Sequence, residues 1–319
     1  MSNTVLRPKT RDEWMKLRES GIGSSEVGTI LGLNPYETPY QLWRRKVGID
    51  PPKEQNFAMK AGHYLENAVS LFYRDETGKE IIKASAGDWI IKSNECPWMQ
   101  VSPDRTFWIP GMPKRKENKG ILECKTTQME VNGDDVPQYW FAQLQYQLGV
   151  AEYSQGALAW LTMGREFGYR DFVFDREFFD FMAEEVARFW VDNVQGGREP
   201  LLLNVDDVLL RNPRHVVGKA VEADKKLLDS CRILKELKEE LADLNTRKEE
   251  IEARIKMAMG DAEALLTPSD GKSKPQILAT WKAAKGSQKF DEKRFAREQP
   301  QSYAKYVYEQ PGSRRFLLK

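Results

Sequence analysis

Histidine and cysteine are scarce in this chain of 319 residues, and their scarcity excludes several kinds of site. His63 and His215 are the only histidines, and the three cysteines, Cys96, Cys124 and Cys231, lie far apart in the sequence. No cluster of these residues has the spacing of zinc ligands, so we do not expect a structural zinc. An odd number of scattered cysteines fits a reducing cytoplasm better than a disulfide framework.

The chain also lacks a strong net charge and a long apolar run. Its 49 lysines and arginines nearly balance 48 aspartates and glutamates, giving a net charge of +1, so a polyanion must bind in a local groove. The longest uncharged run, residues 136–151, contains four glutamines and is too short for a membrane span. The first ten residues lack the apolar core of a signal peptide. We therefore expect a cytoplasmic protein with no membrane partner.

The first two thirds of the sequence contain both helical and strand patterns. This mixture predicts one α/β domain over residues 1–216. Apolar residues recur at helical spacing in several segments, and Ser24 or Ser25 is the expected N-cap of the second helix. Gly21 begins a Gly-rich stretch that resembles a P-loop. No lysine directly follows its last glycine, however, which excludes nucleotide binding of this type. We predict helices over residues 11–18, 24–32, 38–48, 57–75, 136–150 and 175–194, and strands over 88–93, 98–109, 120–126, 156–163 and 168–174.

Residues 217–319 have a different composition and form a predicted accessory region. From residue 218 to 259 the pattern is helical, and apolar residues alternate at intervals of three and four until Lys248 breaks the series. Such a helix is either an intermolecular coiled coil or an arm that packs on its own domain. A hairpin over residues 263–283 and a short helix over 291–309 are predicted to follow.

The stretch KGILECKTTQ, residues 119–128, places charges in a short apolar strand. Alternate side chains of a strand share a face, so Glu123 and Lys125 lie on the same face as Ile121. A surface ion pair on an edge strand is one explanation, since such pairs are common and contribute little stability. The neighbouring strand offers another explanation.

Asp104 lies on the strand that precedes this one, across a predicted hairpin loop. If the register matches, Asp104 and Glu123 become cross-strand neighbours, and like charges in such positions destabilise a sheet. A hard divalent cation such as Mg²⁺ relieves this repulsion, because it binds carboxylate oxygens, carbonyl oxygens and water. Lys125 would then lie beside the bound water, where it orients or deprotonates the nucleophile or neutralises developing charge.

An aspartate followed about twenty residues later by Glu-x-Lys resembles the PD-(D/E)XK nuclease superfamily. Five motifs occur in order along the chain: LRESGIGSSEVGTILGLNPY, GHYLENAVSLFY, VSPDR, ILECKT and FAQLQYQLGV. Together they resemble the phage-type alkaline exonucleases, the YqaJ/lambda-exonuclease branch of viral recombinases, over residues 11–200. The resemblance implies an α/β (α+β) restriction-endonuclease-like core, a central mixed sheet flanked by helices, here with a C-terminal helical arm and small tail.

The same resemblance implies a function and partners. It implies a phage-encoded 5′→3′ exonuclease that uses Mg²⁺, with Mn²⁺ as a substitute, and resects double-stranded DNA ends to 3′ single-stranded tails. It also implies a single-strand annealing protein of the RecT/Red-beta type as partner, a homo-oligomeric ring, and a bacterial host cell. The longer C-terminus departs from the lambda enzyme, which leaves the ring in question.

Site residues follow from the resemblance by matching motifs. The metal ligands are matched by Glu66, Asp104, Glu123 and the backbone carbonyl of Cys124. Lys125 matches the catalytic lysine, and Gln143 matches a glutamine near the reacting centre, so the predicted catalytic set is Lys125, Glu123, Asp104 and Gln143. A pocket for the terminal 5′ phosphate is matched by Arg18, Ser25 and Ser102.

Several of these residues have simpler explanations. Arg18 and Arg105 can be ordinary surface arginines, and for Arg105 we prefer this interpretation. His63 lies one helical turn from Glu66 and is interpreted as a spectator without a role in the site. Gln143 and Gln147, also one turn apart, form either part of a polar helix face or a stripe that lines a cleft. Two other functions remain open: an endonuclease on the same core, and a non-catalytic DNA-end-binding or assembly module.

Overall fold

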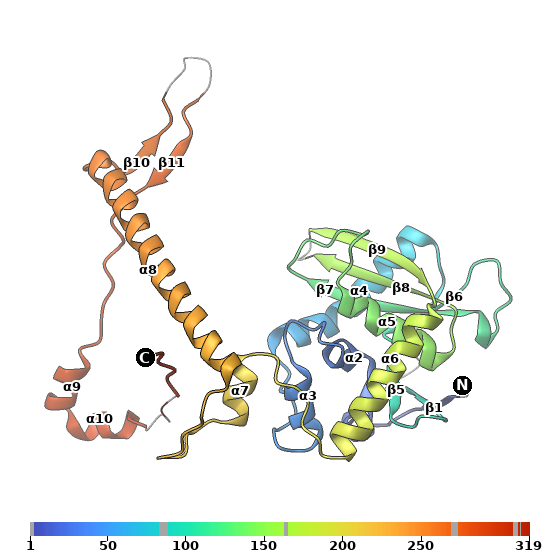
Figure 1. Cartoon of the computed structure of the whole chain (residues 1–319). Coiled ribbons are helices and arrows are strands. Elements are labelled where there is room, and N and C mark those ends of the chain that lie inside the picture. Colours follow the sequence, from blue (N-terminus) through green and yellow to red (C-terminus); the bar gives the residue numbers. More distant parts are fainter. Residues whose placement is uncertain (1–2, 83–88, 163–164, 269–273, 309–311, 313) are drawn as a thin grey trace. The chain divides into compact units, whose positions relative to one another are not determined.

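The structure, a computed structural model, describes residues 3–82, 89–162, 165–268, 274–308, 312 and 314–319. The chain divides into two compact units, Met1–Arg211 and Asn212–Lys319 (Figure 1). The boundary that we expected from composition, between residues 216 and 217, lies five residues beyond this division. The expected roles of the two regions, a nuclease domain and an accessory region, stay predictions.

A five-stranded mixed sheet forms the centre of the first unit. Its strand order is β3-β6-β7-β8-β9, and β7 runs parallel to β8 whereas the other neighbours are antiparallel. The parallel pair is possible because the helix α5 connects its two strands. The strands are β3 (Ile81–Ile82), β6 (Arg105–Trp108), β7 (Lys119–Thr127), β8 (Gln155–Thr162) and β9 (Glu166–Val173).

Two helices cover the faces of this sheet and divide the core into two clusters. On one face, α4 (Phe57–Thr77) packs Val69 and Tyr73 against Leu122 and Cys124 of β7. On the other face, α5 (Gln138–Ala151) packs against a cluster that includes Ile121 (Figure 1). Because side chains alternate along β7, the residues Glu123 and Lys125 face α5. The fold therefore places these two charges in the interior rather than on an outer edge.

A second sheet contacts the same helix. It has four strands in the order β1-β4-β5-β2, namely β1 (Asn3–Leu6), β4 (Ile90–Ser93), β5 (Met99–Val101) and β2 (Ile22–Gly23). Helix α5 contacts β4 and β5 as well as β7 and β8. This double contact explains why ten of its fourteen residues are buried and why its sequence is apolar on most sides.

The predicted strand over residues 98–109 is wrong, because that segment contains two strands in different sheets. Strand β5 ends at Val101, and β6 begins at Arg105 in the five-stranded sheet. Pro103 lies in the break and cannot donate a ladder hydrogen bond, which gives a physical reason for the interruption. Ser102 and Asp104 therefore lie at a junction between sheets rather than on one strand. Some predicted positions lie outside the described residues: Asp88 of the strand 88–93, Met163 of the strand 156–163, residues 269–273 of the hairpin and Glu309 of the last helix.

The remaining helices of the first unit follow the predicted segments closely, except for a helix over residues 205–211 that was not predicted. Thr10, Thr38 and Asp175 cap three of them through side-chain oxygens, as residues of this type commonly do. The N-cap of α2 is Gly23, so the expectation of Ser24 or Ser25 in that role is wrong. These helices are α1 (Arg11–Glu19), α2 (Ser24–Ile30), α3 (Pro39–Lys46), α6 (Arg176–Arg188) with a π-helical continuation (Phe189–Gln195), and α7 (Val205–Arg211).

Gly149 shows how closely α6 packs on α5. A Cβ atom at this position would lie 2.1 Å from Cδ2 of Phe179, whose ring is fully buried. Any larger residue would push the two helices apart, so glycine is required by the close approach and not by its own backbone conformation.

The second unit consists of helices and a hairpin with few buried side chains. Its long helix α8 (Lys225–Met259) has 35 residues and is followed by β10 (Ala264–Leu266) and β11 (Ile277–Thr280), which pair antiparallel. Two short helices, α9 (Glu292–Glu298) and α10 (Pro300–Tyr306), contact each other.

The predicted fold class is confirmed: mixed sheets flanked by helices form the core, and a helical arm with a hairpin and a short helical tail follows. Within the described part of the chain, no helix combines the length and the apolar character that crossing a membrane requires.

Candidate active site

One cleft of the first unit, about 560 Å³ in volume, gathers most of the predicted site residues. Its walls come from α1, the start of α2, α4, the junction between β5 and β6, and the facing parts of β7 and α5. Segments that are far apart in the sequence thus meet at one place. The predicted residues among those that line it are Arg18, Ser25, Glu66, Ser102, Asp104, Glu123 and Gln143.

Glu123 is the most constrained of these residues. Its side chain is 4% exposed and accepts hydrogen bonds from three donors. Lys125 Nζ lies 2.8 Å from Oε1, Gln143 Nε2 also donates to Oε1, and Gln147 Nε2 lies 2.8 Å from Oε2. A buried carboxylate needs such hydrogen-bond partners, so this network satisfies both oxygens of Glu123 and fixes the orientation of its side chain.

Lys125 bridges the strand and the helix. Its ammonium group donates to Glu123 Oε1 and to Gln143 Oε1, each at 2.8 Å, and its side chain is 18% exposed. Burial lowers the pKa of Lys125, but the carboxylates of Glu123 and Asp104 outweigh this effect, so the net shift is upward. The lysine is therefore positively charged at neutral pH in this arrangement.

Asp104 lies next to Glu123, as the register requires. The ladder between β6 and β7 ends with Arg105 opposite Leu122, so Asp104 and Glu123 occupy the next pair of positions. One carboxylate oxygen of Asp104 accepts the amide N–H of Cys124 at 2.7 Å. Burial and then the negative charges of Glu123 and Glu66 raise the pKa of Asp104 well above its ordinary value. The cleft thus concentrates more negative charge than the protein neutralises.

Glu66 faces the same cleft from α4. Its Oε1 lies 3.3 Å from His63 Nδ1, and its Oε2 lies 4.0 Å from Arg105 Nη1. Burial raises the pKa of Glu66, against the opposing effects of His63 and Arg105. The interpretation of Arg105 as a surface residue is wrong: its side chain is only 13% exposed, and its guanidinium donates to the carbonyl of Asp104 at 2.6 Å.

The three residues predicted to bind a 5′ phosphate line the same cleft. Arg18 lies in the last turn of α1. Its guanidinium lies over the Trp14 ring, 4.5 Å from the centroid, and donates from Nη2 to Ser25 Oγ at 3.1 Å. A Cβ atom at Gly23 would lie 3.0 Å from Arg18 Nη2, so the glycine leaves room for the guanidinium. Ser102 reaches the cleft from the junction between the sheets.

The glutamines of α5 separate into two groups. Gln143 and Gln147, one turn apart, both donate to Glu123, but only Gln143 lines the cleft, whereas Gln147 is fully buried. Gln145 points elsewhere: it donates to the carbonyl of Val173 and accepts the N–H of Asp175, both beside the start of α6. Gln147 also lies 3.2 Å from Ser24 Oγ, which connects the network to α2. No role for Gln147 beyond the stripe was predicted from the sequence.

The donor set suits a hard divalent cation, although the side chains do not converge on one point. Three carboxylates line the cleft, and burial, followed by the charges of Glu123 and Glu66, raises the pKa of Asp104. Among the described residues, however, no group of three or more His, Cys, Asp or Glu side chains is arranged to hold a metal ion. Binding by these carboxylates therefore requires Glu123 or Glu66 to exchange some of the protein partners described above.

Comparison with known proteins places the chain in a family. The model of the YqaJ-like viral recombinase domain matches residues 13–154. The "Uncharacterized protein YqaJ" of Bacillus subtilis (strain 168) is 30% identical over 321 residues, an alignment that covers 97% of this chain and 94% of that protein.

Two solved structures share a more distant likeness. The alkaline exonuclease LHK-Exo from Laribacter hongkongensis is 16% identical, with a TM-score of 0.45, over 58% of this chain and 93% of that one. A phage-related exonuclease from Haemophilus somnus 129PT is 12% identical, with a TM-score of 0.40, over 56% of this chain and 96% of that one. The near full-length sequence match carries the assignment: this chain belongs to the YqaJ-like viral recombinase family.

Proposed function

We propose that the protein is a metal-dependent 5′→3′ exonuclease that resects double-stranded DNA ends and leaves 3′ single-stranded tails. The observation that carries the proposal is that Asp104, Glu123 and Gln143 line one cleft and that Lys125 is hydrogen-bonded to Glu123 and Gln143. Buried ionisable groups with perturbed pKa values in a cleft are typical of a catalytic site. Family membership supports a role in recombination.

Metal binding is part of this proposal. Glu66, Asp104, Glu123 and the carbonyl of Cys124 would hold Mg²⁺, with Mn²⁺ as a substitute, because hard cations prefer oxygen ligands. When bound, the metal would supply positive charge at the scissile phosphate and acidify a water molecule. The three carboxylates of the cleft support this assignment, since a cation would relieve the repulsion by Glu123 and Glu66 that adds to burial in raising the pKa of Asp104.

Lys125 would act as a cation rather than as a base. Its pKa is shifted upward, so a proton remains on Nζ at neutral pH, and Gln143 and Glu123 fix the position of that charge. A fixed ammonium group beside the reacting phosphate stabilises the negative charge that develops during hydrolysis. Gln147 would be a positioning residue, because it reaches the reaction only through Glu123.

Arg18, Ser25 and Ser102 would bind the terminal 5′ phosphate. An arginine fork beside hydroxyl groups suits a phosphate dianion, and all three residues line the cleft that contains the carboxylates. A phosphate held there would place the next phosphodiester near Asp104 and Glu123. Such an arrangement would give a preference for DNA ends over internal sites.

The proposal extends to partners. The resected strand would pass to a single-strand annealing protein, and the chain would assemble as a homo-oligomeric ring of a phage-encoded enzyme acting in a bacterial host cell. These points rest on the family resemblance and not on a surface of the molecule.

The test is to incubate linear and closed circular duplexes with the protein in Mg²⁺ and in EDTA, and to follow both strands. Loss of linear DNA alone, only with Mg²⁺ and from 5′ ends, supports the exonuclease. Cutting of the circle would favour the endonuclease alternative, and absence of cutting on both substrates would favour the non-catalytic DNA-end module. Glu123→Ala serves as the inactive control.

A further inference from the structure

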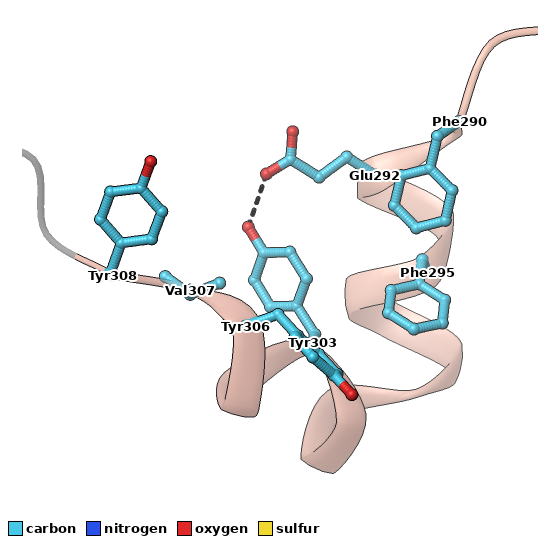
Figure 2. A pocket seen from close by; sticks show the side chains of 7 residues that line it. All are labelled: Phe290, Glu292, Phe295, Tyr303, Tyr306, Val307 and Tyr308. Carbon is cyan, nitrogen blue, oxygen red and sulfur yellow. Dashed lines mark hydrogen bonds between the residues drawn. The ribbon is translucent and has the colours of Figure 1, made fainter. Parts of the chain in front are cut away.

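The two short helices of the second unit surround a cavity of about 430 Å³ that is distinct from the cleft described above. Figure 2 shows aromatic rings from α9, α10 and the adjacent segments arranged around this space. The Phe290 and Phe295 rings lie 5.0 Å apart, and Tyr303 donates its hydroxyl to Glu292 at 2.7 Å. The residues that line the cavity are Phe290, Glu292, Phe295, Tyr303, Tyr306, Val307 and Tyr308.

Most of these rings are exposed rather than packed in a core. Tyr306 and Tyr308 are each 81% exposed and Phe290 is 72% exposed. Trp281 and Phe316, in the same part of the chain, are 49% and 73% exposed. Isolated exposed aromatic residues are common, but a concentration of them on one short segment marks a binding surface.

The same segment is strongly basic. Residues 281–319 contain ten lysines and arginines against four aspartates and glutamates, a net charge of +6, whereas the rest of the chain has a net charge of −5. Four of these basic residues are on the helices around the cavity: Lys293, Arg294, Arg297 and Lys305. Positive charge is therefore concentrated near the exposed rings, although the net charge of the whole chain is only +1.

Exposed rings and positive charge together select a particular ligand. An apolar peptide would satisfy the rings but not the charge, and a duplex would satisfy the charge but keep its bases stacked. A single strand satisfies both, because each base offers a face for stacking and each phosphate offers a charge. Among the described residues, Glu292 is the one acidic residue that lines the cavity; it accepts a hydrogen bond from Tyr303 and is followed by Lys293 and Arg294.

We propose that residues 281–308 bind single-stranded DNA, with Phe290, Tyr306 and Tyr308 stacking on bases and the surrounding lysines and arginines contacting phosphates. The choice of DNA rather than RNA rests on the proposed function, in which a single strand is the product. The binding itself requires no cleavage, so it can be measured without metal.

The experiment measures fluorescence anisotropy of labelled oligo-dT with the full chain in EDTA. The double variant Tyr306→Ala/Tyr308→Ala should bind about 100-fold more weakly, since it removes two stacking rings and each stacked base contributes roughly a factor of ten. The control is Phe181→Ala, which removes a ring that is 51% exposed on α6. Circular dichroism and melting temperature verify that both variants are folded.

A second pair of variants tests the charge independently of the rings. Lys293→Glu with Lys305→Glu should weaken oligo-dT binding and flatten its dependence on salt, because fewer counterions are released. Lys235→Glu, an exposed lysine on α8, is the control and should leave both properties unchanged.

Several outcomes would overturn the proposal. Wild-type affinity in the tyrosine variant would show that the rings serve another ligand, such as a protein. Equal competition by unlabelled duplex would show that the site does not select single strands. A wild-type chain that binds oligo-dT through these tyrosines but cuts no DNA would contradict the proposed exonuclease while supporting this site.

Discussion

The two units of this molecule differ in where they place their polar groups. In Met1–Arg211, Glu123, Gln145 and Gln147 are buried and hydrogen-bonded between a sheet and a helix. In Asn212–Lys319, Met259 is the only buried side chain among the described residues. The first unit has the rigid, desolvated setting in which charges act on a reacting group. The second unit is built mainly of exposed surface, which suits binding rather than chemistry.

The prediction that sharpens this comparison most concerns how the first unit recognises a DNA end. Arg18→Ala should erase most of the preference for a 5′-phosphorylated duplex over the same duplex with a 5′ hydroxyl. The loss should be about 1.5–3 kcal/mol, or roughly 10- to 150-fold, typical of a hydrogen bond to a charged group. Initial rates on the two substrates measure it. Arg18 is not a phosphate ligand if the wild type shows no preference or the variant retains it fully.

A smaller effect separates two glutamines of the same helix. Gln147→Leu should lower turnover about tenfold, because Glu123 loses one of its three donors. Gln145→Leu is the matched control: it removes contacts with Val173 and Asp175, so it should lower the melting temperature but leave turnover near that of the wild type. Equal turnover in the two variants would contradict the assignment of Gln147 as a positioning residue.

Stability without metal tests whether the carboxylates repel one another. The pKa of Asp104 is raised in the folded state, so ionisation at neutral pH opposes folding, whereas below the ordinary pKa of an aspartate this penalty is absent. Asp104→Asn should therefore raise the melting temperature in EDTA at pH 7, by roughly 2–4 °C for about 1 kcal/mol. The gain should disappear near pH 4. A clear fall at pH 7 would mean that the carboxylates are not close.

Removal of the second unit should have the smallest effect on the fold of the first. A chain ending at Arg211 retains the central sheet and every predicted ligand, so its thermal transition should remain cooperative and shift by less than roughly 2–4 °C. Light scattering of the two chains would also show whether α8 mediates association. Insolubility of the shorter chain would mean that the units depend on each other.

Local patterns in the sequence predicted most elements of the fold because these patterns report which face of a segment is apolar. The alternation around Glu123 and Lys125 predicted a shared face, and the structure shows that face directed toward α5. Asp104 and Glu123 were expected to meet across a hairpin, and the register brings them together. Such predictions succeed when the neighbours are close along the chain.

The errors have a different physical origin. The break at Pro103 was missed because strand propensity was given more weight than the missing N–H, although a proline inside a strand pattern argues against a continuous strand. Arg105 was interpreted as exposed because a sequence does not show which helix covers a strand. The separate directions of Gln145 and Gln147 likewise depend on long-range packing. The roles of all these residues in catalysis stay predictions.

The central claim, that the network around Glu123 is a catalytic centre, depends most directly on Lys125. The measurement is the single-turnover rate on a linear 5′-phosphorylated duplex with Mg²⁺, together with metal affinity, for the wild type, Lys125→Ala, and Lys119→Ala as a control on the same strand. We predict that Lys125→Ala still binds metal but loses at least about 100-fold in rate, while Lys119→Ala stays near the wild type. A near-normal rate in Lys125→Ala would contradict the account.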